Sequence, residues 1–416
     1  MKMTLPIKTI FTPSSLSMMA VAFSLIAWLF PDFGVLRKGF IHRESLDMTA
    51  TVMLLCWYAM IFICFVVGQK LGELVFLQRR RPLEKPFSLE SNLFYGTFTF
   101  LAALGTGSTL VRIFTVLPLR EALVYVSLGQ TNALKDTLYQ DYSIGLVSLR
   151  YLVLYPSAIA LYRIIRYKRY SFLNLFNVFH LAVGTFLGSR LILMATLVMT
   201  AFLLTYGRRS VQISIPKIAL WTGFLFLVLA LLNLSRNADY YERNNLSFGL
   251  AGVSEILAYA GSPFQAAVGS AKVADQLAGF GGDQYRDYVD IEVNLNTNSA
   301  FTLLLQQMGY TMWPYFALVC LVMGFLFAAL ASLGRTVFLL PCGAILYASA
   351  EIWRLDLFQQ GTFIIWLVAG AGIPAALLFQ QRVVGILNRA PRSAAISGSY
   401  WQSRGQSGGG EGSELL

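Results

Sequence analysis

The sequence predicts an all-α polytopic membrane protein with about ten transmembrane helices, eleven or twelve being the alternatives, and with one large outer loop that contains short interfacial helices. Hydrophobic residues make up 56% of the 416 residues and charged residues only 13%, whereas a soluble domain carries about a quarter charged residues. The mean hydropathy is +0.61. Apolar runs close to the ~20 residues that cross a bilayer recur along the whole chain, so the bilayer must be the solvent for much of this surface.

The charges give the orientation. A net charge of +11 would suit a nucleic-acid-binding protein, but the basic residues gather in short connectors between apolar runs, as the positive-inside rule describes. We therefore expect no nucleic-acid partner and place both termini in the cytoplasm. The four cysteines, Cys56, Cys64, Cys320 and Cys342, all lie within predicted spans, where neither a disulfide framework nor a metal knuckle is expected.

The spans follow from the apolar runs and their basic boundaries. In chain order they are expected at 14–33, 48–68, 92–114, 143–162, two short spans within 172–206, then 215–234, 311–333, 336–352 and 361–379. Residues 118–142 are polar enough to lie along the membrane as an amphipathic helix. Residues 1–388 form one transmembrane domain, and the Ser- and Gly-rich residues 389–416 are expected to be a disordered cytoplasmic tail.

Three arginines lie in or at the edges of these spans, each toward the outer side: Arg112, Arg150 and Arg190. Charged side chains at such depths are costly and by default mark function. The planar guanidinium suits phosphate oxygens, so a phosphate-bearing lipid could be held where the three converge. The competing interpretation is that each one snorkels to the interface or pairs with an acid.

The large loop, residues 235–310, is the main polar interruption of the chain. A helix over its first residues would place four side chains on one face: Arg236, Asp239, Tyr240 and Arg243. That face would offer hydrogen-bond donors, a carboxylate and an aromatic ring to a sugar. A self-paired interfacial helix is the alternative. The next segment, 246–268, is too apolar for a free loop and too rich in glycine for a full span, so we expect it to lie in the interface or re-enter the membrane.

The end of the loop gathers charged residues without a metal-binding pattern. They are Asp283, Arg286, Asp287, Asp290 and Glu292. The spacing of a calcium loop, with its central glycine and terminal glutamate, is absent. One of these acids could deprotonate a sugar hydroxyl, and the sequence does not choose among them. The two histidines lie outside the loop, and His180, in the middle of a span, is expected to be a hydrogen-bonded packing residue.

With these residues assembled, the chain resembles the O-antigen or oligosaccharide repeat-unit polymerases of the Wzy type. The resemblance covers about residues 90–380 and rests on the many-span layout, the Gly188-Ser189-Arg190 turn after a short span, and an outer loop opened by an arginine-rich segment. The loop closes with Asn296-Thr297, followed by Phe301 and Gly309 at the start of the next span.

The resemblance implies a metal-independent, GT-C-like membrane glycosyltransferase without a cofactor. It implies the bacterial inner membrane, with the large loop in the periplasm. The substrate would be an undecaprenyl-pyrophosphate-linked oligosaccharide, and a chain-length regulator in the same membrane is a further expected partner. Arg190, Arg236 and Arg243 would hold the pyrophosphate, and Asn296 and Thr297 would shape the sugar pocket.

Two groups of candidate residues result. The candidate catalytic residues are Arg190, Arg236, Arg243 and Asp239, and the candidate substrate contacts are Arg112, Arg150, Tyr240, Arg286, Asn296 and Thr297. Two other functions stay open. O-antigen ligases resemble this layout but rely on a histidine in the large outer loop, and this loop has none. A flippase or other transporter predicts charged or broken helices near the midplane and modest loops.

Overall fold

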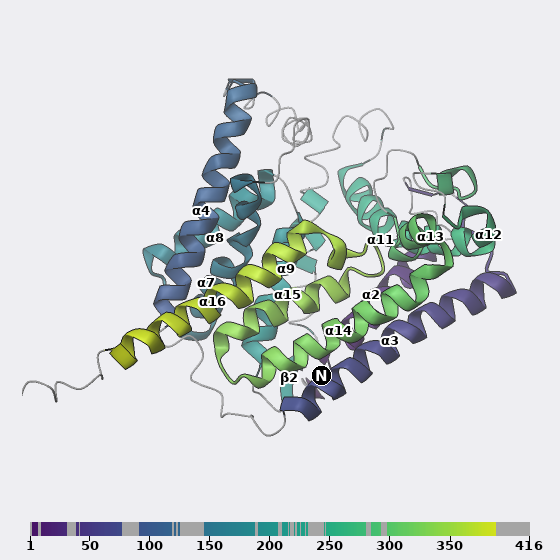
Figure 1. Ribbon diagram of the computed structural model, residues 1–416. Helices are drawn as coiled ribbons and strands as arrows, with labels where there is room; N and C mark the ends of the chain where they lie inside the picture. Colours follow the sequence, from purple (N-terminus) through teal and green to yellow (C-terminus); the bar gives the residue numbers. More distant parts are fainter. Residues whose placement is uncertain are drawn as a thin grey trace, which may run out of the picture.

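The computed structural model describes residues 2–6, 10–30, 39–40, 42–76, 91–118, 145–187, 190–206, 210–214, 247–279, 284–292 and 298–387, together with scattered positions between 120 and 245. Within these residues the protein is almost entirely helical (Figure 1). Four helices are long and apolar enough to cross a membrane: Met48–Phe76, Leu93–Val116, Ala300–Ser332 and Gly361–Gln380. The prediction of a helical membrane protein is confirmed at this level.

The helices and strands follow one another in this order. The α-helices are α2 (Pro13–Trp28), α3 (Met48–Phe76), α4 (Ser91–Val116), α7 (Leu154–Tyr167), α8 (Phe172–Leu187), α9 (Arg190–Thr205), α11 (Phe248–Lys272), α12 (Ala274–Leu277), α13 (Ala300–Met308), α14 (Met312–Ser332), α15 (Leu339–Ala350) and α16 (Gly361–Leu387). The 3₁₀ segments are η3 (Leu146–Val153), η4 (Gln284–Asp287), η5 (Gly309–Thr311), η6 (Thr336–Phe338) and η7 (Leu357–Gln359), and the strands are β1 (Lys2–Pro6) and β2 (Ser210–Ser214).

Most expected spans that fall on described residues coincide with a helix. The region 172–206 forms two short helices, α8 and α9, as expected, and residues 188 and 189 of the predicted turn lie outside the described residues. Helices α3 and α16 run further than expected, to Phe76 and Leu387. The fourth span begins as the 3₁₀ segment η3 before it becomes α7. The amphipathic helix at 118–142, the span at 215–234 and the tail at 389–416 are predictions that lie wholly or mostly outside the described residues.

Local sequence signals explain several helix ends. Helix α2 starts after Thr12, whose hydroxyl accepts the backbone N–H of Ser15, and Pro13 occupies the first turn, where its missing N–H costs nothing. Ser299 caps α13 in the same way by accepting the N–H of Thr302. That helix ends at Gly309 with φ +57°, a conformation that glycine adopts without a Cβ penalty. The turn between α13 and α14 therefore depends on this glycine.

Among the helices that the structure describes, α3 and α14 pack against each other over the greatest length (Figure 1). A Cβ built on Gly68 would lie 2.0 Å from the carbonyl oxygen of Leu321, and one on Gly324 would lie 2.6 Å from the carbonyl oxygen of Phe65. Because two backbones approach so closely only where side chains are missing, the small residues of α3 and α14 determine this contact.

Gly68→Ala should therefore lower the free energy of unfolding by about 1–3 kcal/mol, the usual cost of overpacking. The added methyl would push against a backbone carbonyl, which cannot rotate away. Gly96→Ala is the matched control, because a Cβ there meets nothing within 4 Å. Thermal unfolding of the two variants in detergent micelles measures the difference, and equal melting temperatures would contradict the close approach of α3 to α14.

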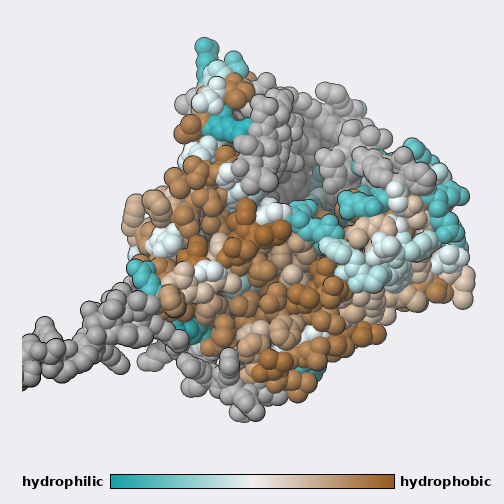
Figure 2. Space-filling view, viewed as in Figure 1, coloured by the Kyte–Doolittle hydropathy of each residue, from teal (hydrophilic) through white to brown (hydrophobic). Residues whose placement is uncertain are grey.

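Apolar side chains are distributed over the protein surface as a bilayer requires. Large apolar side chains are exposed along the outward faces of the long helices, including Leu55 at 65%, Leu318 at 61% and Val368 at 64% exposure. Figure 2 shows this apolar surface across α3, α14 and α16, and polar side chains gathered near α11 and α13. Hydrocarbon is the solvent that such a surface prefers, which agrees with the length and composition of the helices.

One small sheet departs from the all-helical expectation. Strand β1 pairs antiparallel with β2, in the register Lys2↔Ser214 through Pro6↔Ser210. The proline stands at the end of its strand, where a missing N–H interrupts the ladder least. The sheet joins the start of the chain to the segment that follows α9.

The large loop also differs from the prediction of short interfacial helices. Its centre is α11, a helix of 25 residues that continues through Pro263 and packs against α2, α3 and α13. Ser24 of α2 donates its hydroxyl to the carbonyl of Ala260 at 2.7 Å. A Cβ on Gly261 would lie 3.1 Å from the backbone of Trp28. Small residues let α11 lie against the bundle, so much of it is buried among helices.

Candidate functional site

The structure describes the side chains of three predicted site residues: Arg112, Arg150 and Arg286. Arg190 begins helix α9 as the turn predicts, but its side chain lies outside the described part. The remaining candidates, Arg236, Asp239, Tyr240, Arg243, Asn296 and Thr297, also lie outside the described residues. Convergence of Arg112, Arg150 and Arg190 therefore stays a prediction.

Arg150 is the most deeply buried of the three described arginines. It lies in η3 with 6% of its surface exposed, and its guanidinium carbon stands 4.9 Å from the centre of the Tyr151 ring. Nη2 donates to the Tyr151 hydroxyl at 3.1 Å. Nε and Nη1 are buried and have no hydrogen-bond partner among the described residues. A buried cation with two unused donors is costly, and an anionic group would relieve that cost.

The backbone around Arg150 is fixed by close packing. A Cβ on Gly105 of α4 would lie 2.1 Å from the Arg150 nitrogen, so α4 and η3 touch backbone to backbone there. On the other side, the indole nitrogen of Trp366 donates to the carbonyl of Tyr151 at 2.8 Å. The guanidinium therefore starts from a rigid backbone between α4 and α16, which is the preorganisation that binding an anion needs.

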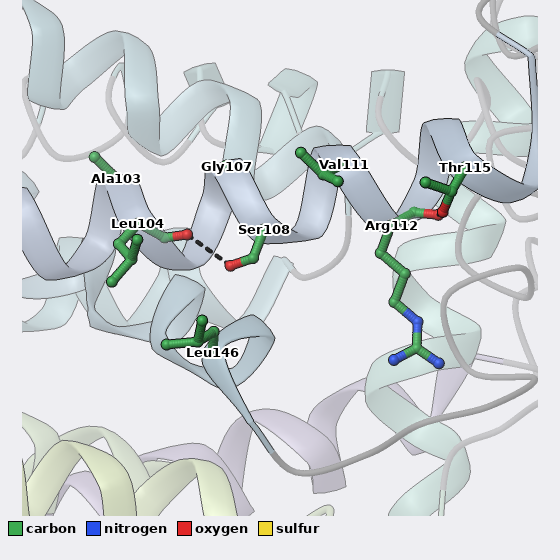
Figure 3. Close-up of a pocket in the computed structure, with 8 residues that line it drawn as sticks. All are labelled: Ala103, Leu104, Gly107, Ser108, Val111, Arg112, Thr115 and Leu146. Carbon is green, nitrogen blue, oxygen red and sulfur yellow. Dashed lines mark hydrogen bonds between the residues drawn. The ribbon is translucent and has the colours of Figure 1, made fainter.

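Arg112 has a different environment (Figure 3). It lies on α4, two helical turns beyond Gly105 on the same face, and lines a cavity of about 610 Å³ together with residues of α4 and Leu146 of η3. Figure 3 shows its side chain leaving the helix on the side where Leu146 lies. Arg112 thus borders an open groove, whereas Arg150 is enclosed by packing.

Arg286 has partners inside the large loop. Its Nη1 donates to the carbonyl of Glu292 at 2.9 Å, and its guanidinium carbon stands 5.3 Å from the centre of the Tyr285 ring. These contacts close the 284–292 segment on itself. The described contacts of Arg286 are therefore ones that shape the loop.

The loop acids make contacts that bear on the choice of a base. Asp290 accepts the backbone N–H of His42 at 3.3 Å, and Glu292 accepts that of Gly39 at 3.1 Å. Both carboxylates hold the loop between α2 and α3 against the large loop. Each carboxylate accepts a backbone N–H, which leaves it fewer free lone pairs for a substrate.

Gln265 of α11 is the centre of the same contact. It is 0% exposed, and its Oε1 accepts both the Trp28 indole N–H at 2.7 Å and the Glu44 backbone N–H at 3.0 Å. Its Nε2 donates to the carbonyl of His42 at 2.8 Å. Nearby, Lys272 forms a 2.6 Å ion pair with Glu44. We call the unit formed by residues 39–40, 42–47, 263–272 and 284–292 the loop cap.

A buried ion pair that the sequence analysis did not single out joins α11 to the end of α15. Glu351 accepts Nε and Nη2 of Arg354, each at 2.8 Å, and also accepts the Tyr347 hydroxyl. Nη1 of Arg354 donates to the hydroxyl of Tyr259 on α11. The two charged side chains are only 13% and 11% exposed. The sequence does contain a signal for this pair, because an acid and an arginine stand three residues apart at the end of an apolar helix.

Asp356, in the connection from α15 to α16, is the other unusual acid. It is 7% exposed, and its Oδ1 accepts the backbone N–H of Phe358 at 3.0 Å, which caps η7. Its Oδ2 is buried and makes no hydrogen bond to the described residues. Burial raises the pKa of Asp356 to about 6, and hydrogen bonding from Phe358 and the nearby Gln359 offsets only part of that rise. A carboxyl with such a pKa can exchange a proton near neutral pH.

His180 behaves as expected from the sequence. It is 5% exposed on α8, and its Nε2 lies 2.6 Å from the Thr106 hydroxyl of α4. The prediction of a hydrogen-bonded packing residue is confirmed.

The fold and these side chains define a helical membrane protein with ionisable groups buried between its helices. No family model matches the chain, and neither a curated protein nor a solved structure is similar to it. Its function therefore has to be inferred from the chemistry of the buried arginines and acids.

Proposed function

We propose that the protein polymerises undecaprenyl-pyrophosphate-linked oligosaccharide repeat units into O-antigen or a related surface polysaccharide, on the periplasmic side of the bacterial inner membrane. In this proposal the growing glycan moves from its lipid carrier to the terminal sugar of an incoming lipid-linked repeat unit. The chain would form about ten spans with a GT-C-like arrangement. Several apolar helices and the sequence resemblance support this proposal.

The observation that carries the proposal is the buried guanidinium of Arg150. Its Nε and Nη1 lack partners among the described residues, in a place where α4 and α16 fix the backbone. A pyrophosphate gains negative charge as it leaves, and donors already oriented toward it stabilise that charge without reorganisation. The planar fork of arginine suits two phosphate oxygens at once. Arg190, Arg236 and Arg243 would complete the site.

The proposed step balances without a metal or cofactor. An acceptor sugar hydroxyl attacks the anomeric carbon of the donor glycan, and the bond between that carbon and the pyrophosphate oxygen breaks. The pyrophosphate keeps the electron pair, and the hydroxyl proton passes to a carboxylate. Of the described loop acids, Asp290 and Glu292 already hold backbone amides. Asp356 also accepts a backbone amide, from Phe358, but it is buried and its pKa is raised to about 6 by that burial, so we propose it as the proton acceptor.

The arrangement of the chain supports the proposed orientation. Figure 1 shows the N-terminus and β2 near the Phe76 end of α3, and α11, α12 and α13 near the Met48 end. The first residues and the segment after α9 are both assigned to the cytoplasm by their basic residues, and the β1–β2 ladder joins them. The loop cap would then lie in the periplasm with both termini in the cytoplasm.

A transporter of lipid-linked oligosaccharides is the second candidate, because the structure contains interrupted helices. The 3₁₀ segment η3 precedes α7, and η5 separates α13 from α14. Arg150 lies within η3 and Asp356 caps the 3₁₀ segment η7, and both are buried ionisable residues. Transporters use broken helices and buried charges of this kind, so the experiment has to separate transport from polymerisation.

Deletion of the gene in its native host separates the candidates. We expect the long polysaccharide ladder to disappear from size-resolved surface glycans, with one repeat unit still attached to the core, because ligation and transport would continue. Restoring the gene on a plasmid should restore the ladder. A bare core in the deletion strain would contradict polymerisation and favour transport or ligation.

A further inference from the structure

A groove on helix α4 has the shape and chemistry of a lipid-binding site. Its wall on α4 follows successive turns of one helix face, and Leu146 of η3 forms the opposite wall (Figure 3). We call this surface the α4 groove; it has a volume of about 610 Å³ and is lined by Ala103, Leu104, Gly107, Ser108, Val111, Arg112, Thr115 and Leu146. The helix that carries it is one of the four able to cross a membrane.

The groove is apolar in spite of its two hydroxyl residues. Ser108 donates its hydroxyl to the carbonyl of Leu104 at 2.7 Å, and Thr115 donates its own to the carbonyl of Arg112 at 2.7 Å. Because these hydroxyls bond their own helix, they offer no donor to a ligand. Gly107 forms an open floor, since a Cβ there meets nothing within 4 Å.

The groove faces outward, where hydrocarbon is the solvent of a spanning helix. Val111 is 64% exposed and Leu104 40% exposed. Apolar space of this kind on the lipid side of a membrane helix is filled by hydrocarbon chains, because water gains no hydrogen bonds there. The occupant is therefore a lipid.

The charge of the groove indicates which lipid. Arg112 is the one charged side chain among the eight lining residues, and its five donors can hold a phosphate alongside other contacts. One guanidinium matches the single negative charge of a phosphodiester. A pyrophosphate carries more charge and needs several donors. Bilayer phospholipids also far outnumber carrier lipids, so mass action favours them at an open site.

We infer that the α4 groove binds one anionic phospholipid of the surrounding bilayer, with an acyl chain over Gly107 and the phosphate at Arg112. This site is separate from the one proposed around Arg150 and does not depend on the proposed function. It places an ordered lipid beside the α4–η3 contact, which also holds the backbone of Arg150.

Lipid titration of the full-length protein tests this inference. The purified protein would be titrated with phosphatidylglycerol or phosphatidylcholine in a mild detergent, with bound lipid counted by native mass spectrometry. We expect about a tenfold preference for phosphatidylglycerol, the effect of one charge-assisted contact. Arg112→Gln should abolish that preference, and Gly107→Leu, which fills the floor, should remove both lipids.

Two variants outside the groove serve as controls. Gly96→Leu adds the same side chain at another open position of α4, and Arg120→Gln removes an exposed arginine that does not line the groove. Both should bind lipid like the wild type. Equal binding of the two phospholipids by the wild type, or an unchanged preference in Arg112→Gln, would overturn the inference. Displacement of phosphatidylglycerol by an equimolar polyprenyl pyrophosphate would assign the groove to the carrier instead.

Discussion

Arg150→Met should abolish the long polysaccharide ladder while leaving the folded protein at least as stable as the wild type. Methionine fills a similar volume without a charge, and replacing a buried ionic group by an apolar one is often neutral or stabilising. The same change removes the donors proposed for the leaving pyrophosphate, a loss of about 10²- to 10³-fold in rate for one such contact. Complementation of the deletion strain measures the ladder, and thermal unfolding of the purified protein measures stability.

Arg166→Met is the matched control for this experiment, because Arg166 is exposed at the end of α7. It should keep both the ladder and the melting temperature. Arg150→Lys should retain only part of the activity, since an ammonium keeps the charge but not the planar fork. A normal ladder in Arg150→Met would remove Arg150 from the site. A strongly destabilised variant would instead show that Arg150 is a structural residue.

Breaking the buried pair of Glu351 and Arg354 should have the largest effect on stability. Arg354→Met leaves the Glu351 carboxylate buried without its cation, which costs about 3–5 kcal/mol when one partner of a buried pair is removed. The double variant Glu351→Gln, Arg354→Met should recover most of that loss, because no charge then stays buried alone. Unfolding of both single variants and the double variant in detergent gives the coupling free energy of the pair.

A surface pair of the same kind provides the comparison. Lys70 and Glu73 also stand three residues apart, at 3.4 Å, but their side chains are 71% and 30% exposed. Glu73→Gln should therefore change the free energy of unfolding by less than about 1 kcal/mol. If Arg354→Met had an equally small effect, the contact between the end of α15 and Tyr259 of α11 would not hold the two helices together.

Regular local patterns made much of the bundle predictable. Apolar runs bounded by basic residues predicted α3, α14 and α16, and the Gly188-Ser189-Arg190 sequence predicted a boundary between α8 and α9. Each of these signals lies within a short stretch of chain, so tertiary packing was not needed to recognise it.

Helix α11 was not predictable in the same way. Its glycines, serines and Pro263 weaken the local helix signal, and in the fold those small residues allow close packing. A Cβ on Gly269 would lie 2.4 Å from the Val289 side chain. Whether a glycine favours packing at such a contact depends on a residue from another element of the fold. The sequence alone therefore indicated an interrupted segment, where the structure has one continuous helix.

The candidate site, too, was only partly predictable from the sequence. The cost of charge in a membrane was enough to single out Arg150, but its unused donors became visible only with its neighbours in place. The pairing of Arg354 with Tyr259 joins residues 95 positions apart. Asp356 was passed over because it stands in a connector, and only the fold shows that the connector is buried.

The ladder between β1 and β2 has a consequence for how the protein is made. Strand β1 includes Lys2 and its partner β2 ends at Ser214, so a ribosome must add roughly 200 residues before the two can meet, which takes about 10–40 s at ordinary rates of translation. During that time the helices between them are already being inserted. The ladder therefore closes only after the helices between the two strands have been synthesised, and it joins β1 to the segment that follows α9.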